Sequence, residues 1–345
     1  MDVAILGATG SCGRQVAAQL IARAILPMSS RVHLVGHENG AHRTELWGLR
    51  ADLADAFSDH APKIEVTTDV AGTKADLVVM MAGATLTKGA TDRVALAETN
   101  RQIFAEAAEG VSRMSNPVTV LVQSNPLELA VSMFAQFIDR SRVIGAGAWS
   151  DSLRFRRELG RDLGLARPKV SAEMWGQHGD HLVPIWSQVQ ARGVTDQKFL
   201  DVIGAARSGR SLKDLPEEIR AAKSETLRLI DQNDVVGAYS FIERQPADIR
   251  AAVKPFFTHF TAGHTTEIAT AHAVVDLIEF ITRGEQMVVP AQVVLSGEMG
   301  ALSGPLGVPI RLNQKGWSTV VETEVAPDEK EALVQASAAI KASLA

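Results

Sequence analysis

The stretch 7-GATGSCG-13 decides the fold of this chain of 345 residues. It directly follows the apolar run 2-DVAIL-6, and the next residues, 14-RQVAAQLIARAI-25, have the composition of a helix. Glycines in this pattern let the backbone turn tightly, approach a pyrophosphate and pack the helix against the strand. The start of the helix adds free N–H groups and a partial positive charge. The strand, loop and helix together therefore predict a dinucleotide-binding turn rather than a turn that needs glycine for its dihedral angles alone.

The predicted contacts to the cofactor phosphates are the residues of this loop: Gly7, Gly10, Ser11, Cys12 and Gly13. Cys12 lies at the helix start, where a thiol can be acidified. A small packing residue is the favoured interpretation. Because Cys12 is the sole cysteine, the chain has no intrachain disulfide and no cysteine-based zinc site.

The N-terminal third alternates apolar runs with helix-like stretches, which is typical of a parallel sheet covered on both faces. The further predicted strands are 31–36, 63–68, 76–83, 118–125 and 142–148. We expect an α/β protein whose residues 1–148 form a Rossmann-type, doubly wound dinucleotide-binding domain.

A second pattern starts near residue 149. It comprises a periodic helix over 150–164, a strand over 169–175, charged helical stretches that include 212–230, Gly- and Pro-punctuated strand runs over 287–325, and a closing helix over 327–344. We expect residues 149–345 to form an α+β catalytic and substrate domain. The sequence assigns no role to the charged segment 196–260.

Composition excludes several classes of protein. No apolar run approaches the roughly 20 residues of a membrane-spanning helix. The net charge of −5 and the absence of a dense Lys/Arg block argue against a nucleic-acid partner. The chain has no basic-then-apolar leader, and we expect a cytoplasmic protein with a small-molecule substrate and no metal ion.

The second strand predicts the type of dinucleotide. In NAD-binding domains this strand ends in an acid that binds the ribose hydroxyls, whereas here it ends at Gly36 and His37. The loss of the acid removes repulsion toward a 2′-phosphate, which His37 or Arg43 can neutralise. NADP is therefore slightly favoured over NAD. Glu38 favours NAD, and the alternative that Gly36 only closes the strand stays open.

A group of three residues suits hydride transfer at a secondary alcohol. Asp151 and Arg154 are three residues apart on the predicted helix and share a face. His178, in the glycine-rich loop 176-GQHGDH-181, can exchange a proton with a substrate hydroxyl because its pKa lies near neutrality. Asp151 can fix the imidazole tautomer, and the planar fork of Arg154 can hold a carboxylate. Considered separately, Asp151 and Arg154 are more simply explained as an ion pair on a helix surface, and His178 as an ordinary loop histidine.

These residues carry a resemblance. The runs 142-RVIGAGAWSDSLRFRRELG-160 and 176-GQHGDHLVPIW-186 resemble the lactate/malate dehydrogenase superfamily, and 33-HLVGHENGAHRTELWGLRADLADA-56 is similar to its archaeal-type malate dehydrogenases. The resemblance covers about 1–195 and 261–345. It implies a nicotinamide-dependent oxidoreductase that acts on a 2-hydroxy or 2-keto acid, and a homodimer or homotetramer.

The resemblance also implies site residues. It makes His178 and Asp151 the proton relay and Arg154 the carboxylate-binding residue, while Asn125 binds the substrate oxygen. In 82-AGATLTKGATDR-93, at the position of the family's mobile lid, Arg93 polarises the carbonyl. Malate-specific relatives carry another arginine where this chain has Thr87. That difference favours a substrate with a neutral or hydroxylated far end, which Thr265 is also expected to line.

Other classes of protein fit the sequence less well. Short-chain dehydrogenases need a Tyr and a Lys four residues apart, but Tyr239, the sole tyrosine, has Glu243 at that offset. An NAD-dependent glycosidase would need a Cys/His metal site, and Cys12 already lies in the phosphate loop. The remaining alternative is a non-catalytic dinucleotide-binding sensor on the same scaffold, which has no need for a proton donor such as His178.

Overall fold

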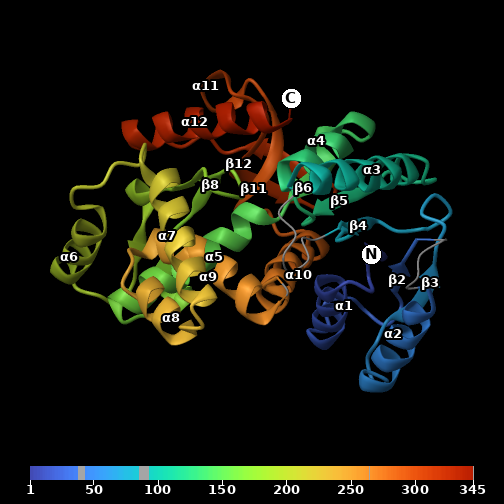
Figure 1. Ribbon diagram of the computed structural model, residues 1–345. Coiled ribbons are helices and arrows are strands. Elements are labelled where there is room, and N and C mark those ends of the chain that lie inside the picture. Colours follow the sequence, from blue (N-terminus) through green and yellow to red (C-terminus); the bar gives the residue numbers. More distant parts are fainter. Residues whose placement is uncertain (38–42, 85–92, 264, 345) are drawn as a thin grey trace. The chain divides into compact units, whose positions relative to one another are not determined.

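The computed structural model describes residues 1–37, 43–84, 93–263 and 265–344, with no side-chain description for 93–97 and 301. The chain divides into two compact units (Figure 1). Unit 1 comprises Met1–Ala146, Glu267–Val289 and Ile310–Thr319, and unit 2 comprises Gly147–Thr266, Pro290–Pro309 and Val320–Ala345. No helix among the described residues combines the length and the apolar character that crossing a bilayer requires.

Unit 1 contains the predicted doubly wound sheet. Its strands are β1 (Val3–Leu6), β2 (Arg31–Val35), β3 (Lys63–Thr67), β4 (Leu77–Met80), β5 (Thr119–Val122) and β6 (Val143–Gly145). They pair in parallel in the order β3-β2-β1-β4-β5-β6. The last residue of β1, Leu6, pairs with Val35 on one side and Met80 on the other, so the carboxyl ends of three strands meet where the strand order reverses. Ligands of open α/β sheets bind at such a point.

The helices of unit 1 come from both ends of the chain. They are α1 (Ser11–Ala22), α2 (Arg43–Ala56), α3 (Arg93–Ser112), α4 (Leu127–Phe137), the 3-10 turn η1 (Arg140–Arg142) and α10 (Glu267–Arg283). Arg23, just after α1, forms ion pairs with Asp276 at 2.7 Å and with Glu279, both on α10. Figure 1 shows α10 beside α1. This packing explains why a segment some 250 residues downstream belongs to unit 1.

Unit 2 is built around α5 (Gly147–Leu163). The other elements that begin in unit 2 are η2 (Arg167–Lys169), β7 (Val170–Ser171), β8 (Met174–Gly176), β9 (Leu182–Pro184), η3 (Trp186–Gln188), β10 (Gln190–Ala191), α6 (Asp196–Arg207), α7 (Leu215–Asp231), α8 (Val235–Glu243), α9 (Ala247–Ala262), α11 (Glu298–Ala301), β12 (Ser303–Asn313) and α12 (Pro327–Leu344). Two long strands, β11 (Val288–Ser296) and β12, contribute residues to both units, and β13 (Gly316–Val320) pairs with β12.

The predicted strand 169–175 is wrong as a single strand. β7 pairs antiparallel with β10 in a small separate sheet, whereas β8 pairs antiparallel with β9 and β12. The break results from packing against α5, whose side chains bind the backbone at Ala172 and at Met174, the first residue of β8. Arg156 Nε donates to the Ala172 carbonyl at 2.8 Å, and the Met174 amide donates to Ser152 Oγ at 2.8 Å.

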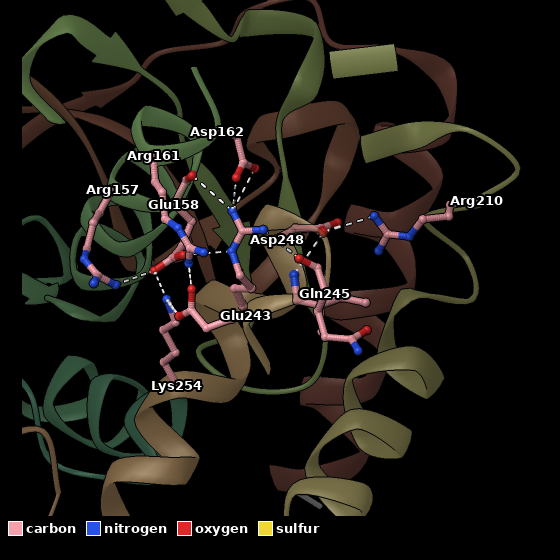
Figure 2. Close-up of polar contacts among 11 residues, drawn as sticks. Arg157, Glu158, Arg161, Asp162, Arg210, Glu243, Gln245, Asp248 and Lys254 are labelled. Atoms are coloured by element: carbon pink, nitrogen blue, oxygen red, sulfur yellow. Dashed lines mark hydrogen bonds and ion pairs between the residues drawn. The ribbon is translucent and has the colours of Figure 1, made fainter. Parts of the chain in front are cut away.

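The charged segment 196–260 turns many of its charges inward. Glu158 of α5 is 1% exposed and accepts from Arg250 Nε at 2.8 Å and Lys254 Nζ at 2.7 Å, both on α9 (Figure 2). The Arg250 guanidinium also binds Asp162 of α5 at 2.7 Å. Burial raises the pKa of Glu158, but the hydrogen bonds from Lys254 and Arg250 lower it by more, so its pKa lies below its ordinary 4.5. A network of ion pairs therefore fastens α9 to α5.

We predict that Arg250→Met lowers the free energy of unfolding by about 3–5 kcal/mol, because removal of one partner leaves the Glu158 charge buried with less compensation. Urea denaturation at pH 7 measures the change. The control is Arg228→Met, whose partner Glu225 is on the same exposed helix face, and which should leave the free energy of unfolding nearly unchanged. An equal effect of both changes would contradict the assigned importance of the network.

The pH dependence follows from the lowered pKa of Glu158. Its stabilising contribution is present above the unfolded-state pKa near 4.5 and is lost as the pH falls through the lower folded-state value. The difference in free energy of unfolding between the wild type and Glu158→Gln should therefore be constant from pH 7 to about 5 and shrink below pH 4.5.

Candidate functional site

The glycine turn of unit 1 is shaped by close backbone contacts. Gly7 has φ +81°, and a Cβ there would lie 2.6 Å from the Ala82 amide nitrogen. A Cβ at Gly13 would lie 2.3 Å from the Gly7 carbonyl oxygen, so the first turn of α1 packs directly against the loop. The Gly10 amide donates to the Gly7 carbonyl at 3.0 Å and closes the turn. The next amides, of Ser11 and Cys12, belong to the first helical turn, where no helical carbonyl accepts from them.

A cleft of about 810 Å³ opens beside this turn, a volume typical of small-molecule and cofactor sites. It lies at the carboxyl ends of β1, β2 and β4, where the strand order reverses. The lining residues are Leu6, Gly7, Thr9, Gly10, Val35, Gly36, His37, Arg43, Thr68, Val70, Met81, Ala82, Gly83, Ala84, Ile103, Glu106 and Ala107. The cradle therefore has room for an extended ligand with a phosphate at the start of α1.

Cys12 is not a reactive thiol in this structure. Burial raises its pKa to about 11, so the thiol stays protonated near neutral pH. The interpretation of Cys12 as a small packing residue agrees with that direction, because the thiolate is the form that reacts.

The end of β2 combines opposite charges. Gly36, His37 and Arg43 line the cleft, as does Glu106 of α3, which the sequence reasoning missed. Glu106 Oε2 lies 3.7 Å from His37 Nε2. Glu38 lies outside the described residues.

In unit 2 the structure brings Asp151, Arg154 and His178 together. His178 Nδ1 lies 2.7 Å from Asp151 Oδ2, and Arg154 Nη1 donates to Asp151 Oδ1 at 2.8 Å. Burial raises the pKa of Asp151, but the charges and hydrogen bonds of His178 and Arg154 lower it more, so it lies below its ordinary 3.8. An ionised carboxylate only accepts hydrogen bonds. His178 therefore donates to Asp151 through Nδ1–H, and Nε2 is its second ring nitrogen.

The second terminal nitrogen of Arg154 has a partner in the segment that joins α9 to α10. Arg154 Nη2 donates to Thr266 Oγ1 at 3.1 Å. The neighbouring Thr265, which the sequence predicts to line the far end of the substrate, is half-buried. The sequence shows two adjacent threonines, but only the fold shows which of the two hydroxyls accepts the hydrogen bond from Arg154.

The loop 176–181, which carries His178, is held by its own hydrogen bonds. Gly176 has φ +81°, and a Cβ there would lie 2.7 Å from the His181 carbonyl. The Gln177 amide donates to that carbonyl at 3.1 Å, and the His181 amide donates to Gln177 Oε1 at 3.3 Å. Asp180 extends from the loop and binds Lys223 Nζ of α7 at 2.6 Å.

The two histidines of this loop differ in their surroundings. Burial and then the nearby Arg220 lower the pKa of His181, which favours its neutral form. His178 instead faces an ionised carboxylate. The Asp151 carboxylate orients the ring of His178 through Nδ1.

Two of the predicted site residues are not described by the structure, and a third is exposed. Thr87 lies outside the described residues, and so does the side chain of Arg93, the first residue of α3. Asn125 is exposed at the end of the segment that follows β5. Its carbonyl accepts from Asn100 Nδ2 at 2.8 Å.

Asn100 is a further residue that the sequence reasoning missed. It is fully buried on α3 and also binds both the amide and the carbonyl of Ala84, at 2.7 and 3.0 Å. It therefore joins the chain after β4 to the chain after β5. Asn100 shares a helix face with the apolar residues Phe104 and Ala107, and a buried amide needs hydrogen-bond partners, so the pattern could have indicated a structural role.

Among the residues that the structure describes, no group of three or more His, Cys, Asp or Glu side chains could hold a metal ion. The chemical groups brought together are an imidazole, a carboxylate and a guanidinium in unit 2 and a glycine turn at the start of α1 in unit 1.

Comparisons with known proteins identify relatives along the whole chain. A model of the NAD-binding domain of lactate/malate dehydrogenases matches residues 1–145, and a model of their α/β C-terminal domain matches residues 261–345. The malate dehydrogenase of Halobacterium salinarum is 29% identical over 343 residues, which cover 99% of this chain and 97% of that enzyme. The L-lactate dehydrogenase of Gloeobacter violaceus is 28% identical over 290 residues, 82% of this chain and 78% of that enzyme.

Solved structures share the fold. The malate dehydrogenase from Aeropyrum pernix matches with a TM-score of 0.78 at 21% identity and covers 99% of this chain and 97% of its own. The minor L-lactate dehydrogenase from Enterococcus mundtii matches with a TM-score of 0.77 at 23% identity, with the same coverage. The predicted α/β fold class is confirmed.

We predict that Lys223→Gln loosens the loop 176–181, because Lys223 supplies the contact that ties Asp180 to α7. Amide hydrogen exchange of Gln177, Gly179 and His181 should accelerate by about three- to tenfold. Arg228→Gln is the matched control, since Arg228 lies on the same helix and binds Glu225 instead. Unchanged exchange in Lys223→Gln would show that the loop is held by its internal hydrogen bonds alone.

Proposed function

We propose, because the chain belongs to the lactate/malate dehydrogenase superfamily, that it interconverts a small 2-keto acid and its 2-hydroxy acid through the residues described above. The chain is an oxidoreductase of this superfamily, and its cofactor is a nicotinamide dinucleotide. The observation that carries the residue assignment is the buried, ionised Asp151, which binds His178 and Arg154 at the same time. The assignment of cofactor binding to residues 1–148 and of catalysis and substrate binding to residues 149–345 stays a prediction.

The cradle of unit 1 fits the phosphates of this cofactor. The close contacts at Gly7 and Gly13 leave no room for side chains, so backbone amides of Gly10, Ser11 and Cys12 can approach an anion directly. When bound, the nicotinamide donates a hydride to the substrate carbon or accepts one from it. The matched domain model describes an NAD-binding domain, and nothing in the comparisons supports the NADP preference that the end of β2 suggested.

His178 is the proposed acid and base. Its Nε2 gives a proton to the carbonyl oxygen during reduction and takes it back from the hydroxyl during oxidation. Asp151 fixes the tautomer through Nδ1 and stabilises the charged ring, because its own pKa keeps it ionised at neutral pH.

Arg154 is the proposed binding residue for the substrate carboxylate. Asp151 and Thr266 each accept from one of its terminal nitrogens, which fixes the plane of the guanidinium. A guanidinium has five N–H donors, so donors remain for a bidentate contact with a carboxylate. Lysine offers no such fork.

The remaining assignments rest on the superfamily. We propose that Asn125 binds the substrate oxygen and that Arg93 polarises the carbonyl. Thr87 and Thr265 line the far end of the substrate. A homodimer or homotetramer and a cytoplasmic location also stay predictions. The comparisons give no support to the alternative of a non-catalytic sensor.

The experiment that tests the proposed function is a panel of 2-keto acids supplied with NADH or with NADPH, with turnover followed by the loss of nicotinamide absorbance. The assignment is supported if at least one 2-keto acid is reduced and if Arg154→Lys strongly lowers the rate of that reduction. If no 2-keto acid of the panel is reduced with either cofactor, the proposed function is wrong.

We predict that His178→Asn lowers kcat by about two to four orders of magnitude, the usual contribution of an acid–base group. The affinity for the reduced cofactor, measured by fluorescence titration, should stay nearly constant. His181→Asn is the control on the same loop and should change kcat far less. If the two substitutions have equal effects, His178 is not the proton donor.

We also predict that Thr87→Arg increases kcat/KM for oxaloacetate relative to monocarboxylic 2-keto acids. The reason is that malate-specific relatives carry an arginine at this position, and an unpaired distal carboxylate is costly to bury. Steady-state kinetics with oxaloacetate and pyruvate measure the ratio. A variant that loses activity toward both in proportion would contradict the assigned position of Thr87.

A further inference from the structure

The cofactor cleft of unit 1 contains a carboxylate that neither the sequence pattern nor the proposed function uses. Glu106 of α3 lines the cleft together with Gly36, His37 and Arg43, the residues at the position where NAD-binding domains hold the ribose. We propose that Glu106 selects NAD over NADP and replaces the acid that β2 lacks. This inference rests on the proposed dinucleotide site and adds the residue that decides its specificity.

The structure shows why the acid is absent from its usual place. Gly36 directly follows β2, and a Cβ at this position would lie 2.6 Å from Leu46 Cδ1. Leu46 is 1% exposed and belongs to the buried face of α2. An aspartate at residue 36 would therefore require a core leucine to move. Glu106 of α3 offers a carboxylate that lines the same cleft.

Apart from Glu106, the charged residues described at this end of the cleft favour a 2′-phosphate. His37 and Arg43 both line it, and each is a side chain that can carry a positive charge. Glu106 reverses that preference, because its Oε2 lies 3.7 Å from His37 Nε2 and so places a negative charge beside the imidazole. A 2′-phosphate at this site would have to displace Glu106 from His37 and then remain close to its charge.

A carboxylate discriminates between the two ribose forms in a simple way. Ionised Glu106 only accepts hydrogen bonds. The 2′- and 3′-hydroxyls of NAD can both donate to it, whereas the 2′-phosphate of NADP is an anion with acceptors and repels it. The side chains of Glu106 and His37 are 70% and 67% exposed, so Glu106 has the freedom to turn toward a ribose.

The next acid on α3 provides a matched control. Glu109 lies three residues further along the helix and forms an ion pair with Arg113. It lines a neighbouring hollow rather than the cofactor cleft, whereas Glu106 lines both. A change at Glu109 removes the same charge from the same helix and leaves the ribose end of the cleft untouched.

Equilibrium binding of NADH and NADPH to the full chain tests the proposal without any substrate. Titrations followed by nicotinamide fluorescence give both dissociation constants for the wild type, Glu106→Gln and Glu109→Gln. We expect the wild type to bind NADH about tenfold or more tightly than NADPH, because the Glu106 carboxylate and a 2′-phosphate beside it repel each other. Glu106→Gln should weaken NADH binding, strengthen NADPH binding and so reduce the ratio by about tenfold, while Glu109→Gln keeps it.

Glu106→Arg extends the test, because it replaces the repulsion with attraction and should make NADPH the tighter ligand. A wild type that prefers NADPH, or a Glu106→Gln variant that changes both affinities equally, overturns the inference and leaves the proposed function intact. Binding of neither dinucleotide overturns both. Circular dichroism of each variant shows that an altered ratio does not come from loss of the fold.

Discussion

The structure of unit 2 depends on one buried negative charge, that of Asp151. A carboxylate withdrawn from water is costly unless charged hydrogen-bond donors replace the solvent. Here His178 and Arg154 both do so, and together they lower the pKa of Asp151 despite its burial. The same two contacts orient the groups that the proposed reaction needs. The imidazole has its proton on Nδ1, and the guanidinium has its fork fixed in one plane by Asp151 and Thr266.

The charges of α5 continue this arrangement along one face of the helix. After Asp151 and Arg154, the same face carries Glu158 and then Asp162, at intervals of three or four residues. The last two bind Arg250 of α9, and α9 ends just before the connection to Thr266. The helix that carries the proposed proton relay is therefore fastened, by its own buried ion pairs, to the helix that leads to the partner of Arg154 (Figure 2). The segment 196–260, to which the sequence assigned no role, therefore supports the helix that carries Asp151, because its charges that face α5 bind the charges of that helix.

The sequence predicted those parts of the protein that depend on short stretches of chain. The loop 7–13, the six parallel strands and the helix with Asp151 and Arg154 follow from patterns within some twenty residues, and the structure contains them. Long-range packing was out of reach. The single strand expected over 169–175 is interrupted by side chains of α5, and α10 joins unit 1 through its ion pairs with Arg23. Thr266 and Asn100 were missed for the same reason, since each receives its meaning from a partner far along the chain.

The end of β2 shows most clearly how a local rule and a spatial arrangement can lead to different conclusions. Read along the chain, Gly36 followed by His37 is a dinucleotide site that has lost its acid, and NADP is the natural inference. In the folded unit, α3 brings Glu106 to within 3.7 Å of His37, and the charge that the strand lacks returns from 70 residues downstream. What a ribose would meet is the sum of the charges that line the cleft, whichever element supplies them. Packing connects the two positions, because a side chain at residue 36 would displace the buried Leu46, whereas a carboxylate on the exposed surface of α3 displaces nothing in the core.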